Sequence, residues 1–200
     1  MLKIFHVPGT RSNRVIWLAE EMGIPYETKA ETFGQFSEEF MAANPCGAMP
    51  AIVDDGVCMG ESVAIMHYLT ERYGPTPLAL KPDDPRYADY VQFLIFGEAS
   101  LAAYLNPVFM TNFMAPEDQR ANVTVDFAKT LFRSRLRSID AQLAKGDYMA
   151  GDFTAADISV GYALGIGAAV GLDADYSPAV KSYMARVQAR PAFQAMQAVK

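Results

Sequence analysis

Residues 44–65 read NPCGAMPAIVDDGVCMGESVAI, and the strongest structural signals of the chain lie in this stretch. Pro50 stands just before two β-prone runs, 51–53 and 57–59, which flank the turn sequence Asp-Asp-Gly and predict a hairpin. A Gly-Glu-Ser sequence then opens a helix expected over residues 62–73. The hairpin and the helix after it indicate one edge of a small α/β domain.

The residues before this stretch predict two further strands and two helices. Residues 2–7 alternate in polarity and end in Pro-Gly, which indicates a first strand. Residues 12–22 repeat apolar side chains every three or four positions, with Ser12 expected as the N-cap. A short strand over 25–30 and a short helix over 37–43 complete the order β-α-β-α-β-β-α. A right-handed crossover makes the first two strands parallel, and the hairpin completes a mixed sheet.

A proline-rich stretch separates this domain from a helical one. Residues 75–85 contain four prolines, a density that excludes regular structure and is typical of a linker. We therefore expect an α/β domain over 1–74 and an all-helical domain over 86–200. Helical patterns in the second domain cover residues 87–114, 117–145, 155–170, 177–189 and 191–199.

Composition excludes several classes of protein. The chain has 200 residues, of which 51% are hydrophobic and 20% charged, so it is too apolar for a disordered protein. Its net charge of −6 argues against nucleic-acid binding, which needs clustered Lys and Arg. Residues 1–85 carry 6 basic and 12 acidic side chains, so an anion bound there needs local donors or helix termini.

The remaining composition predicts a reduced cytoplasmic protein without metal. Cys46 and Cys58 are the only cysteines, and neither a disulfide framework nor a zinc motif can be built from them. The first residues contain no apolar signal segment. The longest uncharged apolar stretch, 158–172, contains glycines and is shorter than the roughly 20 residues that a membrane span needs.

Residues 8–12, Pro-Gly-Thr-Arg-Ser, carry the first chemical signal. Hydroxyl and backbone N–H groups gather here at the start of a predicted helix, where a thiolate or another anion is stabilised. The alternative is that Thr10 or Ser12 only caps the helix.

Two further segments suggest recognition of a peptide-like ligand. A cis bond before Pro50 would turn the Met49 backbone outward to pair with an extended peptide, whereas an ordinary proline at a strand start would not. Glu61 and Ser62 open a helix and suit the zwitterionic end of an amino acid, although they also suit a simple cap. Thr154 and its partner three residues later indicate a structural capping box.

Together these residues resemble the cytosolic glutathione S-transferases of bacterial type. The matching motifs are PGTRS at 8–12, NPxGxMP at 44–50, ESVAI at 61–65 and GxxTxADI at 151–158. The resemblance covers essentially the whole chain and implies a thioredoxin-like domain followed by a helical domain. It also implies a homodimer that activates the glutathione thiol for attack on a small, largely apolar electrophile, a detoxification reaction.

The resemblance assigns the glutathione contacts residue by residue. It implies that Pro50 is cis, that the Met49 backbone pairs with the cysteinyl unit, and that Glu61 and Ser62 hold the γ-glutamyl end. Glutathione is the expected co-substrate, and no metal is expected.

The catalytic position departs from several related classes. Arg11 stands where the beta class has a cysteine, which argues against a mixed disulfide with glutathione. We expect Ser12 or Thr10 to donate a hydrogen bond to the glutathione thiolate, while Arg11 or Arg14 adds positive charge.

The electrophile is expected between the sheet domain and the first long helix of the second domain. The candidate lining residues are Tyr104, Phe109 and Phe113, with two neighbouring methionines, and their alternative role is ordinary core packing. Two other functions stay open: a protein that binds glutathione or apolar ligands without turnover, and a glutathione-dependent peroxidase or isomerase.

Overall fold

The computed structural model describes all 200 residues. The chain forms two compact units, one made of Met1–Ala79 with Gln188–Lys200 and the other of Leu80–Val187. Each unit has its own buried core, and each is described in turn.

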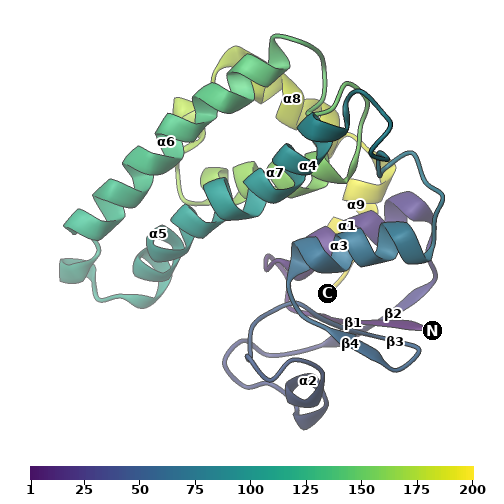
Figure 1. The fold of residues 1–200 in the computed structure, drawn as a ribbon. Helices are drawn as coiled ribbons and strands as arrows, with labels where there is room; N and C mark the ends of the chain where they lie inside the picture. Colours follow the sequence, from purple (N-terminus) through teal and green to yellow (C-terminus); the bar gives the residue numbers. More distant parts are fainter. The chain divides into compact units, whose positions relative to one another are not determined.

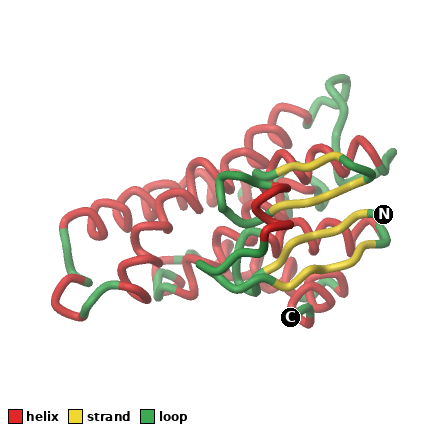
Figure 2. Tube along the Cα trace, turned by 90° about the horizontal axis from the view of Figure 1, so that it is seen from below, coloured by secondary structure: helices red, strands yellow, loops and turns green.

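The first unit contains a four-stranded mixed sheet, whose strands lie side by side in Figure 2. Its strands lie in the order β2-β1-β3-β4, with β1 parallel to β2 and antiparallel to β3. β4 pairs antiparallel with β3, as the hairpin pattern predicted. The strands are β1 (Leu2–His6), β2 (Tyr26–Ala30), β3 (Ala51–Asp54) and β4 (Val57–Met59).

Helices cover both faces of this sheet (Figure 1). On one face lie α1 (Ser12–Met22) and α3 (Ser62–Arg72), and on the other lies α2 (Glu38–Ala43). Phe5 on β1 is fully buried and packs edge-on against Phe40 of α2, with ring centroids 5.6 Å apart. The predicted order β-α-β-α-β-β-α is confirmed.

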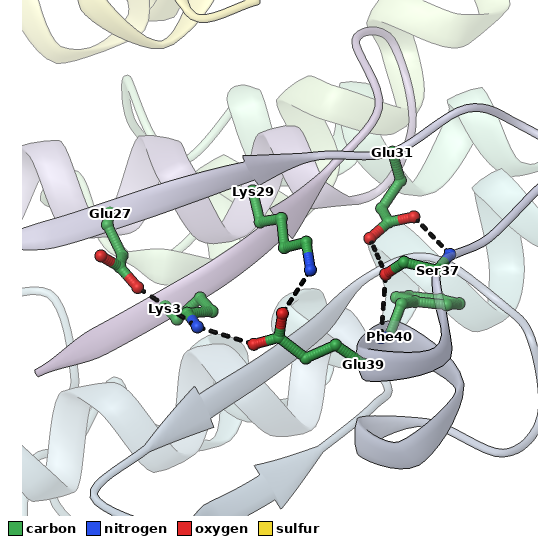
Figure 3. A network of polar contacts seen from close by, with 7 residues as sticks. All are labelled: Lys3, Glu27, Lys29, Glu31, Ser37, Glu39 and Phe40. Atoms are coloured by element: carbon green, nitrogen blue, oxygen red, sulfur yellow. Dashed lines mark hydrogen bonds and ion pairs between the residues drawn. The ribbon is translucent and has the colours of Figure 1, made fainter.

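Charged side chains also hold α2 to the sheet (Figure 3). Glu39 of α2 accepts hydrogen bonds from Lys3 of β1 and Lys29 of β2. These bonds lower the pKa of Glu39 to about 2. Beside them, Glu31 accepts from the backbone N–H of Ser37, the N-cap of α2, at 2.8 Å. The short helix is therefore fixed at both its N-cap and its first turn.

The last helix, α9 (Pro191–Ala198), packs in the first unit. Phe193 meets Trp17 of α1 edge-on, with ring centroids 4.9 Å apart. Arg190 donates two hydrogen bonds, of 2.6 and 2.7 Å, to the carboxylate of Glu21. This differs from the helical domain expected over 86–200, because the apolar side of α9 covers α1 rather than other helices of the second unit.

The second unit is helical, as predicted, but two of its long helices are interrupted. The helix expected over 87–114 contains a π-helical turn at Gly97–Ala102, and the one expected over 117–145 begins only at Val123 after a 3₁₀ turn at Glu117–Gln119. Asn122 caps it by accepting from the N–H of Val125 at 3.0 Å. The helices are α4 (Tyr87–Phe96), α5 (Ala103–Met114), α6 (Val123–Leu143), α7 (Ala155–Ala169) and α8 (Pro178–Gln188).

In this unit, other helical segments pack closely against α7. Gly97 approaches α7 so closely that a Cβ built on it would lie 2.4 Å from the Ser159 Oγ. At Gly167 of α7 a Cβ would meet Phe132 of α6 at 2.7 Å. The predicted capping box at the start of α7 is confirmed, with Thr154 and Asp157 each satisfying the other's backbone N–H. By length and composition alone, Tyr87–Met114 could cross a membrane, although part of it is buried against α7.

Candidate functional site

The strand register gathers three loops at one end of the sheet. Ala51 lies opposite Phe5, so Pro50 stands beside the end of β1, where the loop to α1 begins. Met59 lies opposite Ile52, so the residues that lead from β4 into α3 reach the same end. The predicted motifs at 8–12, 44–50 and 61–65 therefore meet in the first unit.

Thr10 and Ser12 lie in direct contact at the start of α1. Their hydroxyl oxygens are 2.9 Å apart, and the Thr10 hydroxyl donates to the Val7 carbonyl at 2.7 Å. Ser12 is completely buried, whereas Thr10 is half-buried. Of this pair, only Thr10 therefore has surface that a ligand can reach.

The expectation that Ser12 caps α1 is wrong. Arg11 occupies the N-cap position without a side-chain capping bond, and Ser12 is the first helical residue. The amides of Asn13 and Arg14 donate to the carbonyls of Thr10 and Arg11 at 3.0 and 3.2 Å. Because these amides have partners, side-chain hydroxyls are the more available donors in this turn.

The hydroxyl of Ser12 is instead held by a histidine. His6 at the end of β1 is 1% exposed, and its Nδ1 lies 2.8 Å from the Ser12 Oγ. Burial lowers the pKa of His6, and the nearby Val199 backbone offsets this only in part. No local pattern predicts a partner for His6, because a strand residue and a helix residue six positions apart come into contact only through the turn between them.

The two candidate arginines have different surroundings. Arg11 is half-buried, whereas Arg14 is fully buried inside α1. Arg14 Nη1 donates to the Oγ of Ser62, the first residue of α3, at 3.1 Å. A buried cation thus lies behind the start of α3, in the part of the chain where acidic residues predominate.

The loop before β3 is held by Asn44. The Met49-Pro50 bond is cis, as the resemblance implied. Asn44 is buried, and its amide nitrogen donates to the Ala48 carbonyl at 2.6 Å and lies 3.4 Å from that of Pro50. A Cβ on Gly60 would lie 2.7 Å from this nitrogen, so Gly60 is small because Asn44 fills the space. The Asn44 side chain therefore joins the loop at 44–50 to the loop before α3.

Glu61 and Ser62 differ in accessibility. Glu61 is exposed and has a positive φ of 63°, an uncommon backbone conformation for a residue other than glycine. Ser62 is 2% exposed, with its hydroxyl oxygen held by Arg14. Glu61 is thus the polar side chain of this pair that points to solvent.

The predicted electrophile residues lie on α5 in the second unit. Phe109 and Phe113 are 37% and 61% exposed, and their rings lie against each other at a tilt, with centroids 4.6 Å apart. Tyr104 is half-buried, and the Arg135 guanidinium lies over its ring at 5.4 Å from the centroid. The alternative that the two phenylalanines are ordinary core is therefore wrong, because their rings lie open to solvent.

Two smaller expectations can also be compared with the structure. The hairpin pattern predicts a buried Cys58, but Cys58 is exposed, as is Cys46. No group of three or more His, Cys, Asp and Glu side chains is arranged to hold a metal ion.

Comparison with known proteins places the chain among well-described relatives. Residues 1–71 match the family described as glutathione S-transferase, N-terminal domain. Over 170 residues the chain is 33% identical to glutathione S-transferase 3 of Schizosaccharomyces pombe, covering 78% of this chain and 70% of the relative. It is 28% identical over 159 residues to glutathione S-transferase GstB of Escherichia coli, covering 76% of each.

Solved structures agree with these sequence matches. A glutathione transferase from Methylococcus capsulatus is 25% identical with a TM-score of 0.85, covering 98% of this chain and 97% of that one. A sphingomonad glutathione S-transferase solved with glutathione is 26% identical with a TM-score of 0.83, covering 98% and 96%. The predicted fold, a thioredoxin-like domain with a helical region, is confirmed.

Proposed function

Because the chain belongs to the glutathione S-transferase family, we propose that it activates the glutathione thiol for attack on a small, largely apolar electrophile. Relatives that carry the glutathione S-transferase name match 78% and 76% of the chain. The sphingomonad relative was solved with glutathione bound. The chain is thus a transferase enzyme with glutathione as its co-substrate.

The half-buried position of Thr10 at the start of α1 is the observation that carries the mechanism. A free thiol with a pKa near 8.5 is only a few per cent ionised at pH 7, and lowering that pKa by about two units, or about 2.7 kcal/mol, makes the thiolate predominant. Thr10 supplies a hydrogen bond at the start of α1, where the helix dipole also favours an anion. Ser12 is fully buried, which supports Thr10 rather than Ser12 as the donor.

The loops beside Thr10 suit the rest of glutathione. The Met49 backbone, just before β3, pairs with the cysteinyl unit as an added strand would. The exposed Glu61 carboxylate accepts from the ammonium group of the γ-glutamyl unit, and the start of α3 at Ser62 faces its carboxylate. Arg14 adds positive charge behind Ser62, and the half-buried Arg11 adds charge to the first turn of α1.

The electrophile contacts the exposed apolar side chains of α5. Phe109 and Phe113 form an exposed aromatic pair, and Tyr104 lies about one and a half turns before Phe109. Two exposed methionines, Met110 and Met114, add adaptable surface to this group. Such a surface accepts apolar molecules of different shapes.

The cellular setting follows from the family. A homodimer in the cytoplasm, acting in detoxification without membrane, nucleic-acid or metal partners, is the expected state of the protein. Sedimentation of the purified chain over a range of concentrations tests the dimer, and a mass of one chain throughout would contradict it.

Ultraviolet titration of bound glutathione tests the mechanism without any choice of electrophile. The thiolate absorbance is followed against pH with the protein in excess, and binding is confirmed by calorimetry. We expect a thiol pKa well below the free value, which rises toward it in Thr10→Ala and stays low in Thr10→Ser. Tight binding with an unshifted thiol in the unmodified protein would instead support a carrier without turnover.

A substrate panel then defines the acceptor. Aryl halides and enones report conjugation, and organic hydroperoxides report reduction. Turnover of hydroperoxides alone would replace the transferase mechanism by a peroxidase reaction that uses the same thiolate.

A further inference from the structure

His6 is a buried titratable group beside the proposed site that the mechanism does not use. It ends β1, directly before the loop that carries Thr10, and is 1% exposed. Its Nδ1 lies 2.8 Å from the Ser12 Oγ, and Ser12 in turn lies 2.9 Å from the Thr10 Oγ1. An unbroken line of hydrogen-bonding atoms thus runs from the buried imidazole to the hydroxyl of the half-buried Thr10.

The hydroxyl protons of Thr10 and Ser12 have few hydrogen-bond acceptors available along this line. The Val7 carbonyl oxygen lies 2.7 Å from the Thr10 Oγ1 and 3.3 Å from the Ser12 Oγ. Without the imidazole, both hydroxyls would compete for that carbonyl and for each other. His6 reduces this competition because it gives Ser12 a separate hydrogen-bond partner.

The result does not depend on which nitrogen of His6 carries the proton. When Nδ1 accepts, the Ser12 proton points to the imidazole and its oxygen faces Thr10. When Nδ1 donates, the Ser12 oxygen is occupied by His6 and its proton turns to Thr10. In both arrangements Ser12 is engaged with His6, and the Thr10 proton stays on the Val7 carbonyl until a thiolate competes for it.

The Val7 carbonyl keeps a hydrogen-bond partner when the Thr10 hydroxyl turns away from it. The backbone N–H of Thr10 donates to the same oxygen at 3.2 Å. When the Thr10 hydroxyl turns toward a thiolate, this amide keeps the carbonyl hydrogen-bonded. Turning therefore leaves no buried carbonyl without a partner, which is the main cost that would oppose it.

We infer that His6 is a positioning residue, which holds Ser12 so that the Thr10 hydroxyl alone donates to the glutathione thiolate. This inference rests on the proposed function, because it assigns a role at the same thiol. It adds a residue that touches neither glutathione nor the electrophile and acts through Ser12.

Substitutions at the two histidines of the chain test the role. His6→Leu removes the ring nitrogen, and His6→Asn restores a polar atom near the position of Nδ1. His67 lies exposed on α3, so His67→Leu is the matched control. Each variant is examined for its melting temperature, the pKa of the bound glutathione thiol, and turnover with chlorodinitrobenzene.

We expect His6→Leu to raise the thiol pKa by about half a unit to one unit and to lower kcat about fivefold, the size of effect that one hydrogen bond produces. KM for glutathione changes less than about twofold, because no glutathione contact is lost. His6→Asn recovers most of the shift, and His67→Leu matches the unmodified protein.

Ser12→Ala provides a second test if His6→Leu fails to fold. It removes one oxygen atom from the same line, and we expect an equal rise in thiol pKa, with no further rise when it is combined with His6→Asn. If a folded His6→Leu or Ser12→Ala protein gave the same thiol pKa as the unmodified protein, the role of His6 would be overturned. The proposed function would stand. An unshifted thiol in the unmodified protein would overturn the proposed function and this role together.

Discussion

Arg14 Nη1 lies 3.1 Å from the Ser62 Oγ, so a fully buried guanidinium joins the first turn of α1 to the first residue of α3. The two residues are 48 positions apart in the sequence. A charge removed from water is stabilised only when hydrogen bonds satisfy it. The contact therefore both fixes the two helix starts and places positive charge where the glutathione carboxylate is proposed to bind.

We expect Arg14→Met to weaken glutathione binding about tenfold, because it removes this charge and the hydrogen bond that orients Ser62. Calorimetry of glutathione binding measures the effect. Arg72→Met is the control, since Arg72 lies at the other end of α3 with a 55% exposed side chain. Equal affinities in the two variants would contradict the role given to Arg14.

Asp157→Ala should destabilise the protein by about 3 kcal/mol, because buried donors lose their acceptor. The carboxylate accepts from the backbone N–H groups of Met149 and Thr154, both at 2.9 Å, and from Tyr183 Oη at 3.1 Å. Urea unfolding measures the loss. A loss below about 1 kcal/mol would mean that the capping box is dispensable.

The same residue predicts a pH dependence. Burial raises the pKa of Asp157 from 3.8 to about 6, so the folded state binds this proton more tightly than the unfolded state. Its contribution to stability is complete below about pH 4 and is lost as the pH rises through about 6, by at most about 3 kcal/mol. Urea unfolding between these pH values should show the decline, and Asp157→Asn should remove it.

Two glycines of α7 should respond oppositely to alanine. At Gly167 a Cβ would lie 2.3 Å from Tyr176 Oη, whereas at Gly165 nothing lies within 4 Å. Gly167→Ala should therefore cost about 1–3 kcal/mol through overpacking, and Gly165→Ala should gain up to about 1 kcal/mol through helix propensity. Thermal unfolding of the two variants decides this, and a shift of the same sign in both would refute the packing argument.

The ion pairs that hold Glu39 of α2 to the sheet should persist except in strong acid. The pKa of Glu39 is lowered to about 2 by Lys29 and Lys3, so its ion pairs hold above its ordinary pKa and are lost as the pH falls toward 2. NMR titration of the Glu39 carboxyl carbon should give this low midpoint. Lys29→Met should raise the midpoint, whereas Lys81→Met, on an exposed residue of the other unit, should leave it unchanged.

The first unit could be predicted closely because its signals are local. Alternation in residues 2–7, the turn residues before β4 and the periodicity of residues 12–22 each report on a single element, and each element was found. The cis bond at Pro50 came from the resemblance, since no local signal separates cis from trans there.

The hydrogen bonds of the site could not be predicted in the same way. Ser12 has the right side chain for a cap, but the turn before it rotates its hydroxyl toward His6. The contact of Arg14 with Ser62 depends on how α1 and α3 lie on the sheet, and periodicity does not report this. Side-chain partners across elements therefore had to come from the structure.

The second unit shows a different limit. An apolar pattern over 87–114 indicates a helix, but it does not report the π-helical turn that Gly97 allows beside Ser159. The apolar pattern of residues 191–198 likewise predicts the apolar face of α9. It does not report that this face packs against α1. Both errors concern packing between elements rather than the elements themselves.

The packing of α9 on α1 determines which of the two units can complete its packing first during synthesis. The ion pair of Arg190 with Glu21 joins residues 169 positions apart, and Phe193 covers Trp17 only after the whole helical unit has been made. During synthesis on the ribosome, one side of α1 in the sheet unit therefore stays uncovered while Leu80–Val187 emerges. The second unit in the sequence is thus the first that can complete its packing in the growing chain.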